Sequence, residues 1–156
     1  MSYFQMHADS IQLKNLTTDY TNFFNQAQAP SENLKVCVII PARDEAQNIQ
    51  KTLDALRLQT DDYHTPLNPQ SYEVLLLVNN CTDNTFEIGK SYQQQYPDFC
   101  LHLAKVQLPP QKANIGFVRR ILMDEAYQRL CLNTDNEGII ASTDGDTQVD
   151  CCWIFH

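Results

Sequence analysis

Glycine is scarce in this sequence, with four residues among 156. Neither a G-x-G-x-x-G turn nor a Walker loop occurs, and both motifs need glycines where the backbone approaches phosphate. This composition disfavours dinucleotide-binding dehydrogenases and P-loop NTPases. No G-x-S-x-G elbow surrounds Ser142 and Thr143, which also disfavours a serine hydrolase.

Long apolar runs and metal-binding cysteine patterns are missing too. No 18 apolar residues follow one another, and residues 1–34 contain no basic stretch leading into an apolar one. We therefore expect a cytoplasmic protein, with a peripheral position at a membrane surface as the alternative. The six cysteines form no C-x-x-C pair, which disfavours a structural zinc site. We expect Cys37 and Cys131 to be small buried hydrophobes.

Basic residues are outnumbered, 11 against 19 acidic ones, giving a net charge of −8. Polymeric nucleic acid needs clustered Lys and Arg, so a nucleic-acid partner is not expected. A small anionic ligand stays open, because the field in a cleft depends on nearby charges. Lys112, Arg119 and Arg120 flank the start of a predicted helix, where they either reach a diphosphate or remain solvated.

The order of apolar and polar segments predicts one α/β domain after an N-terminal extension. Residues 1–34 are mixed and polar, with a short helix expected around Thr18 to Gln28, and the domain covers residues 35–156. Strands and helices should alternate, forming a mostly parallel sheet of about four strands with flanking helices. Strands are expected at Val36–Ile40, Glu73–Val78, Cys100–Val106 and Gly138–Ser142, and helices at Glu45–Gln59, Thr85–Tyr96 and Ala113–Cys131.

Two carboxylates follow the last predicted strand, in the sequence Thr143-Asp144-Gly145-Asp146. In a parallel sheet, ligands bind beyond the carboxyl ends of the strands. Neighbouring carboxylates repel each other unless a cation lies between them, and hard divalent cations prefer carboxylate and phosphate oxygens. This position therefore indicates a Mg²⁺ or Mn²⁺ site at Asp144 and Asp146. The alternative is a simple turn, because Asp and Gly favour turns.

Three segments together resemble family 2 glycosyltransferases of the GT-A fold. They are VCVIIPARDEAQNIQKTLDAL (Val36–Leu56), EVLLLVNNCTDNT (Glu73–Thr85) and GIIASTDGDTQVDCCWI (Gly138–Ile154), in the family's order. The resemblance implies a Rossmann-like GT-A half that binds a nucleotide-diphosphate sugar of the UDP or GDP type. It implies that Asp144 and Asp146 form the D-x-D metal motif.

The same resemblance implies which residues contact the sugar nucleotide. Pro41, Ala42, Arg43 and Glu45 are expected to lie along the nucleotide. Asn79 replaces the family's usual acid at the base, so an acceptor-only contact becomes an amide that donates and accepts. We also expect Lys112, Arg119 and Asp144 at the donor. Arg43 and Glu45 could instead cap the first helix and pair with each other.

Two features depart from the family pattern. Cys151 and Cys152 stand where Pro and Asp usually precede the Trp. The chain ends 10 residues after Asp146, whereas the resemblance places the acceptor half and its catalytic carboxylate further on. We therefore expect a glycosyltransferase domain incomplete at its C-terminus, without the general base. Its open sheet edge could pair two copies into a homodimer.

Two rival functions remain beside donor binding for sugar transfer. A sugar nucleotidyltransferase has a similar fold but should carry a Gly-rich phosphate loop, and PARDEAQ has no glycine. A non-catalytic domain would bind a nucleotide sugar or a protein partner without turnover.

Overall fold

The computed structural model describes residues 23–132 and 137–156, in which four strands and three helices alternate. In chain order they are β1 (Val36–Ala42), α1 (Ile49–Arg57), β2 (Tyr72–Asn79), α2 (Thr85–Gln95), β3 (Leu101–Val106), α3 (Ile115–Cys131) and β4 (Ile139–Ser142). Every strand and helix predicted from residue 35 onward is present, with shifted ends. The predicted α/β class is confirmed.

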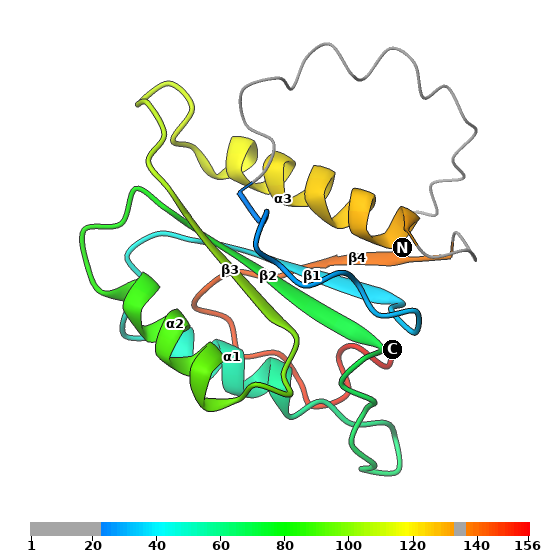
Figure 1. Ribbon diagram of the computed structural model, residues 1–156. Coiled ribbons are helices and arrows are strands. Elements are labelled where there is room, and N and C mark those ends of the chain that lie inside the picture. Colours follow the sequence, from blue (N-terminus) through cyan, green and yellow to red (C-terminus); the bar gives the residue numbers. More distant parts are fainter. Residues whose placement is uncertain (1–22, 133–136) are drawn as a thin grey trace.

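The four strands form one parallel sheet in the order β3-β2-β1-β4. Helix α3 covers one face of this sheet, and α1 and α2 cover the other (Figure 1). Because all strands run the same way, their carboxyl ends lie at one edge of the sheet. Loops that follow different strands therefore meet there, as expected for a ligand site in this class of fold.

The central strands β1 and β2 are buried along their whole length. On one face, side chains such as Ile39 and Leu77 pack with Leu122 of α3. On the other face, Ile40 and Leu76 pack with Leu53 of α1. Burial on both faces explains why these strands read as continuous apolar runs, since each buried Leu or Ile contributes roughly 1.5–3 kcal/mol.

Strand β1 continues through Pro41, where the sequence predicts its end. The neighbouring β4 pairs with β1 only up to Ile39, opposite Ser142. The carbonyl of Ile39 faces β4, where it accepts from Thr143 N, so the backbone nitrogen of Pro41 faces the same side. No strand lies beyond Ser142 to need an N–H from Pro41, so the missing donor costs little.

Two other predicted boundaries also differ. Helix α1 begins at Ile49, and residues 46–48 form a turn whose Asn48 N–H binds the Glu45 carbonyl at 3.0 Å. Of the helix expected at Thr18–Gln28, residues 18–22 lie outside the described residues, and residues 23–27 form turns and a bend. Phe24 is nevertheless buried under α3.

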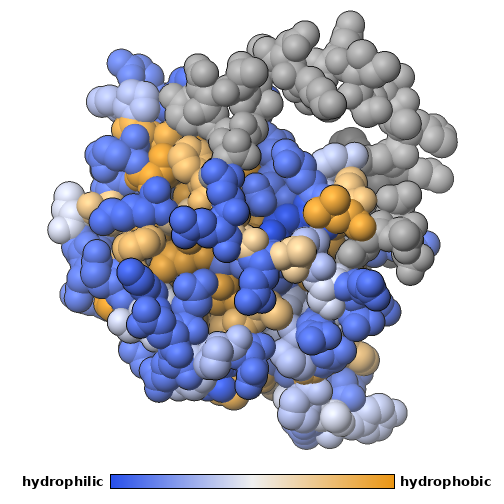
Figure 2. All heavy atoms as spheres, in the orientation of Figure 1, coloured by the Kyte–Doolittle hydropathy of each residue, from blue (hydrophilic) through white to orange (hydrophobic). Residues whose placement is uncertain are grey.

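The surface combines hydrophilic side chains with separate hydrophobic patches (Figure 2). Large exposed apolar side chains include Leu132 at 72% and Ile139 of β4 at 61%. In the described part of the chain, β4 pairs with β1 alone, so its outer edge is open. Pairing of two copies through an open edge stays a prediction. None of the described helices is both long and apolar enough to span a bilayer.

Candidate functional site

A reciprocal pair of aspartates joins the loop after β1 to the loop after β2. Asp44 Oδ1 accepts hydrogen bonds from the N–H groups of Thr82 at 2.6 Å and Asp83 at 3.3 Å. In return, Asp83 Oδ2 accepts from Ala46 N at 3.0 Å. We call Asp44, Thr82, Asp83 and Ala46 the loop clasp. It fixes two loops that are almost 40 residues apart in sequence.

The backbone and charge of the clasp suit this role. Asp44 has a φ of 55°, a left-handed conformation that Asp tolerates better than most side chains. The Thr85 hydroxyl donates to Asp83 and also accepts from Glu45 N at 2.9 Å. The hydrogen bond from Thr85, followed by that from Ala46 N, lowers the pKa of Asp83. The Asp83 carboxylate therefore stays anionic across the neutral range.

The Asp-Gly-Asp sequence lies at the same edge and forms a turn. Thr147 N donates to the Asp144 carbonyl at 3.2 Å, and the Thr52 hydroxyl on α1 donates to the Gly145 carbonyl at 2.8 Å. A Cβ on Gly145 would come within 3.0 Å of Glu45 Cγ and 3.3 Å of Ala42 Cβ. Only glycine fits this approach without displacement, so the turn and the first loop touch. The simple turn is present, and it brings Asp144 beside the expected nucleotide loop.

A cation from α3 reaches this turn. Arg119 Nη2 donates to Asp144 Oδ1 and forms an ion pair with it. Both side chains are partly exposed, at 37% and 53%. The Arg119 Nε atom is buried without a hydrogen-bond partner among the described residues. Of the predicted cations, Arg119 is thus brought to the acidic turn, whereas Lys112 Nζ lies 5.6 Å from the Phe117 ring and Arg120 is exposed.

Asn79 and Arg43, which are also expected to contact the ligand, differ in their exposure to solvent. Asn79 ends β2 and is 3% exposed, and its side-chain amide has no hydrogen-bond partner in the described residues. Arg43 follows β1, is exposed, and forms no ion pair with Glu45 or any other described residue. The alternative in which Arg43 and Glu45 pair with each other is therefore not what the structure shows. Glu45 instead accepts from the Asn48 amide at 3.2 Å.

Residues 37–107 match the family model "Glycosyl transferase family 2". This segment, which is slightly less than half of the chain, is therefore similar to that family. The match covers nearly all of β1, then α1, β2, α2, β3 and the loop clasp, and it ends before α3 and β4.

This chain is also similar to known proteins over part of their length. Glycosyltransferase AglE of Haloferax volcanii is 44% identical over 62 residues, which are 39% of this chain and 18% of AglE. S. aureus TarS superposes on 78% of this chain with a TM-score of 0.58 and 18% identity, over 18% of its own length. TarS 1-349 in complex with UDP-GlcNAc gives 0.55 and 22%, covering 76% of this chain and 28% of that one. The structures share the GT-A fold, and this chain spans about a fifth of AglE.

The donor atoms of the acidic turn suit a hard divalent cation. Asp146 is exposed, and its carboxylate accepts only a long bond of 3.4 Å from Thr147 Oγ1 in the described structure. Asp144 retains a second oxygen beside the one that Arg119 occupies. Two such carboxylates with substrate phosphate oxygens make the ligand set that Mg²⁺ or Mn²⁺ prefers. In the loop clasp, by contrast, the aspartate oxygens already accept backbone N–H bonds.

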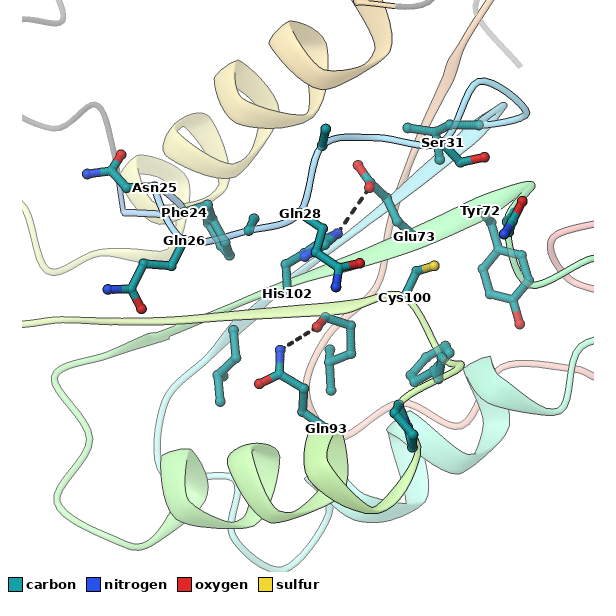
Figure 3. A pocket seen from close by; sticks show the side chains of 18 of the residues that line it. Phe24, Asn25, Gln26, Gln28, Ser31, Tyr72, Glu73, Gln93, Cys100 and His102 are labelled. Carbon is teal, nitrogen blue, oxygen red and sulfur yellow. Dashed lines mark hydrogen bonds and ion pairs between the residues drawn. The ribbon is translucent and has the colours of Figure 1, made fainter.

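A second polar cluster lies at the opposite edge of the sheet (Figure 3). Arg129 of α3 binds Glu73 through two bonds of 2.7 and 2.8 Å, and donates to the Gln28 carbonyl at 2.8 Å. His102 Nε2 lies 3.2 Å from Glu73 Oε2. The cluster borders a cavity of about 830 Å³ beneath residues 23–31.

Electrostatics fix the charge of this buried cluster. Burial alone would raise the pKa of Glu73, but hydrogen bonds from Arg129 and His102 outweigh it and lower the pKa to about 2. Burial raises the pKa of the Cys37 thiol beside Glu73. The cluster therefore holds one buried ion pair whose groups satisfy each other, which is the arrangement of a structural element.

The sequence analysis missed several of these features. It gave no role to His102, which lies in β3 with its side chain 11% exposed and contacts Glu73. Cys37 is buried as predicted, whereas Cys131 is exposed at the end of α3, so that expectation is wrong. The loop clasp was also missed, although the polar run NNCTDNT after β2 was a signal for it.

Proposed function

We propose that this chain binds a nucleotide-diphosphate sugar at the carboxyl edge of its sheet, as the donor-binding part of a family 2 glycosyltransferase. The observation that carries this proposal is the contact of Arg119 with Asp144, next to the exposed Asp146. One cation and two carboxylates meet beside a glycine that lets the loops touch. This combination of charges suits a diphosphate held with a divalent metal.

Different residues at this edge would bind different parts of the ligand. Arg119 and Arg43 supply positive charge at the edge, and the guanidinium group of Arg is suited to phosphate oxygens. Asp144 and Asp146 would hold Mg²⁺ or Mn²⁺, which supplies charge neutralisation for a leaving diphosphate when bound. Pro41 and Ala42 end β1, and Ala42 and Glu45 lie next to Gly145 of the acidic turn, so these three residues would line the nucleotide.

Asn79 would contact the nucleotide base. Its side chain is almost buried, and its amide has no hydrogen-bond partner among residues 23–132 and 137–156. Because an amide both donates and accepts, it suits uracil and guanine alike.

The relatives support this reading at the level of the whole enzyme. AglE is named a glycosyltransferase, and TarS 1-349 was solved with UDP and with UDP-GlcNAc. This chain spans a small share of each, so we assign it donor binding. Transfer to an acceptor hydroxyl also needs a general base that takes up the hydroxyl proton.

Calorimetric titration of the full chain with UDP- and GDP-sugars, with and without Mn²⁺, tests the proposal. We expect binding in the presence of Mn²⁺ and a loss of at least about tenfold for Asp146→Ala, since ligand removal weakens metal sites by this order or more. The matched control is Asp124→Ala, an exposed carboxylate on α3, which should bind as the unaltered chain does. Metal-independent binding would refute the metal site.

Arginines 119 and 120 provide a second matched pair. They are adjacent on α3, but only Arg119 contacts Asp144. We expect Arg119→Ala to weaken nucleotide-sugar binding by about tenfold, because it removes charge-assisted hydrogen bonds worth about 1.5 kcal/mol or more. Arg120→Ala should leave the affinity unchanged. Equal effects of the two substitutions would contradict a donor site at this edge, as would a folded chain that binds no nucleotide sugar.

A further inference from the structure

The turn that follows the acidic motif is held rigidly against the loop after α1. Gln59, which is 2% exposed, donates from Nε2 to the Asp150 carbonyl at 2.7 Å and accepts from Ile154 N at 2.8 Å. Thr60 N also donates to the Cys151 carbonyl at 2.7 Å. In Figure 1 the C-terminal turn lies beside this loop. The side chains on the turn are therefore presented in a fixed arrangement.

Four potential ligand atoms meet on this turn. Cys151 Sγ and Cys152 Sγ lie 3.7 Å apart. Cys151 Sγ is 3.7 Å from Asp150 Oδ1, and Cys152 Sγ is 3.4 Å from the Asp61 carbonyl oxygen. The two sulfurs and the carboxylate oxygen all lie within 4.8 Å of one another. Cys151 is exposed and Cys152 is partly exposed, so an ion can reach them from solvent.

These separations match the edges of a tetrahedral metal site. With metal–sulfur bonds of about 2.3 Å, two sulfurs of a tetrahedron lie about 3.8 Å apart. With metal–oxygen bonds of about 2.1 Å, a sulfur and an oxygen lie about 3.6 Å apart. The three separations on the turn, 3.7, 3.7 and 3.4 Å, are close to these values.

We propose that Cys151 and Cys152 bind a thiophilic divalent cation of the Zn²⁺ class, with Asp150 and the Asp61 carbonyl completing a tetrahedral site. Thiolate sulfur selects Zn²⁺ over Mg²⁺ or Mn²⁺. Each thiol releases one proton to solvent when its sulfur binds the ion. The Asp150 oxygen accepts Cys152 N at 3.0 Å and has lone pairs left for a metal.

This site is distinct from the donor site at Asp144 and Asp146. Its ligands are two sulfurs, whereas the acidic turn offers only carboxylates, so the two sites should select different metals. A bound ion would join the C-terminal turn to the loop around Asp61, which hydrogen bonds and the contact of His156 Nε2 with Asp62 Oδ1 at 2.9 Å already connect. Two adjacent cysteines lack the spacing of known zinc motifs, which explains why sequence patterns give no signal for the site.

Titration of the reduced full chain with Co²⁺, followed by Zn²⁺, tests the proposal. We expect thiolate-to-cobalt charge-transfer absorption in the near ultraviolet, abolished when Zn²⁺ displaces Co²⁺. Carboxylates do not give this absorption, so the Asp144–Asp146 turn cannot mimic it, and an Asp146→Ala chain should retain it.

Single substitutions define the ligands. Cys151→Ser and Cys152→Ser should each weaken Zn²⁺ binding by at least about tenfold and remove most of the absorption. Cys131→Ser, an exposed thiol at the end of α3, is the matched control and should change neither. The proposal is overturned if the reduced, folded chain shows no charge transfer, or if the Cys151→Ser and Cys152→Ser double variant binds Zn²⁺ as tightly as the unaltered chain. The folded state of each variant is checked by circular dichroism.

Discussion

The two edges of the sheet use the same kinds of charged residue in opposite ways. At the amino edge, Glu73 and Arg129 are buried and form two hydrogen bonds with each other. At the carboxyl edge, Arg119 and Asp144 also pair, but they remain partly exposed, and Asp146 and Arg43 have no charged partner among the described residues. A charge pair that is buried and complete supports the fold. A charge pair that is partly exposed and has unsatisfied neighbours can exchange its protein partner for a ligand.

The largest effect on stability is expected at the amino edge, from Arg129→Ala. This substitution leaves the Glu73 carboxylate buried with His102 as its main remaining partner. Removing one partner of a buried ion pair typically costs 3–5 kcal/mol, so we expect a loss of about 4 kcal/mol in the free energy of unfolding. Urea denaturation measures it. Arg120→Ala on the exposed side of α3 should change stability by no more than about 0.5 kcal/mol.

A large loss for Arg129→Ala would sharpen the contrast between the two edges. The corresponding variant at the carboxyl edge, Arg119→Ala, removes a partly exposed pair and should cost about 1 kcal/mol or less. Equal losses from Arg129→Ala and Arg119→Ala would break it.

The pH dependence of stability should also originate at the amino edge. The pKa of Glu73 is lowered from 4.5 to about 2 in the folded chain. The unfolded chain therefore takes up a proton at Glu73 as the pH falls below 4.5, while the folded chain does so only near 2. Stability from this group is complete above pH 4.5 and falls by about 3 kcal/mol by pH 2.

Denaturation at a series of pH values measures this loss. Burial raises the pKa of Glu125, so that residue contributes with the opposite sign, and it does so mainly above pH 4.5. A Glu73→Gln variant should lose most of the dependence below pH 4.5. An unchanged slope in that variant would place the acid sensitivity elsewhere.

A smaller effect is expected at the carboxyl edge from Gly145→Ala. The added methyl group would meet Glu45 Cγ at 3.0 Å and Ala42 Cβ at 3.3 Å. Overpacking of this kind costs about 1–3 kcal/mol, and the shifted turn should also weaken nucleotide-sugar binding. Urea denaturation and calorimetry measure the two effects.

The control is Gly116→Ala in the first turn of α3, where the new Cβ meets only Asn114 Oδ1 at 3.5 Å. Alanine favours a helix over glycine, so this variant should be as stable as the unaltered chain or more stable by up to about 1 kcal/mol. Similar losses at both glycines would show that the close approach at Gly145 does not matter.

Much of the fold was predictable because its central strands are buried on both faces. The short apolar runs around Ile39 and Leu75 favour strands that are buried on both faces. The helices were predictable from the spacing of apolar residues within each helix. Glu73 illustrates the limit of this reasoning. It begins an apolar run, and only its pairing with Arg129, 56 residues later, shows why a carboxylate is tolerated there.

The candidate site was predictable in part for the same reason. Strand ends located Asp144, Asp146 and Asn79 at one edge, because parallel strands share it. The contact of Arg119 with Asp144 depends on how α3 lies across the sheet, which local sequence does not specify. The partners in the loop clasp are separated by 37 to 39 residues and form no recognisable local pattern.

The loop clasp has a consequence for the thermodynamics of ligand capture. Fixing one backbone residue costs about 1–2 kcal/mol of conformational entropy, and flexible binding loops lose this entropy when the ligand arrives. Asp44 and Asp83 hold both loops in place before any ligand is present. A nucleotide sugar would therefore meet a preorganised surface, and little of its binding free energy would be lost in ordering the protein.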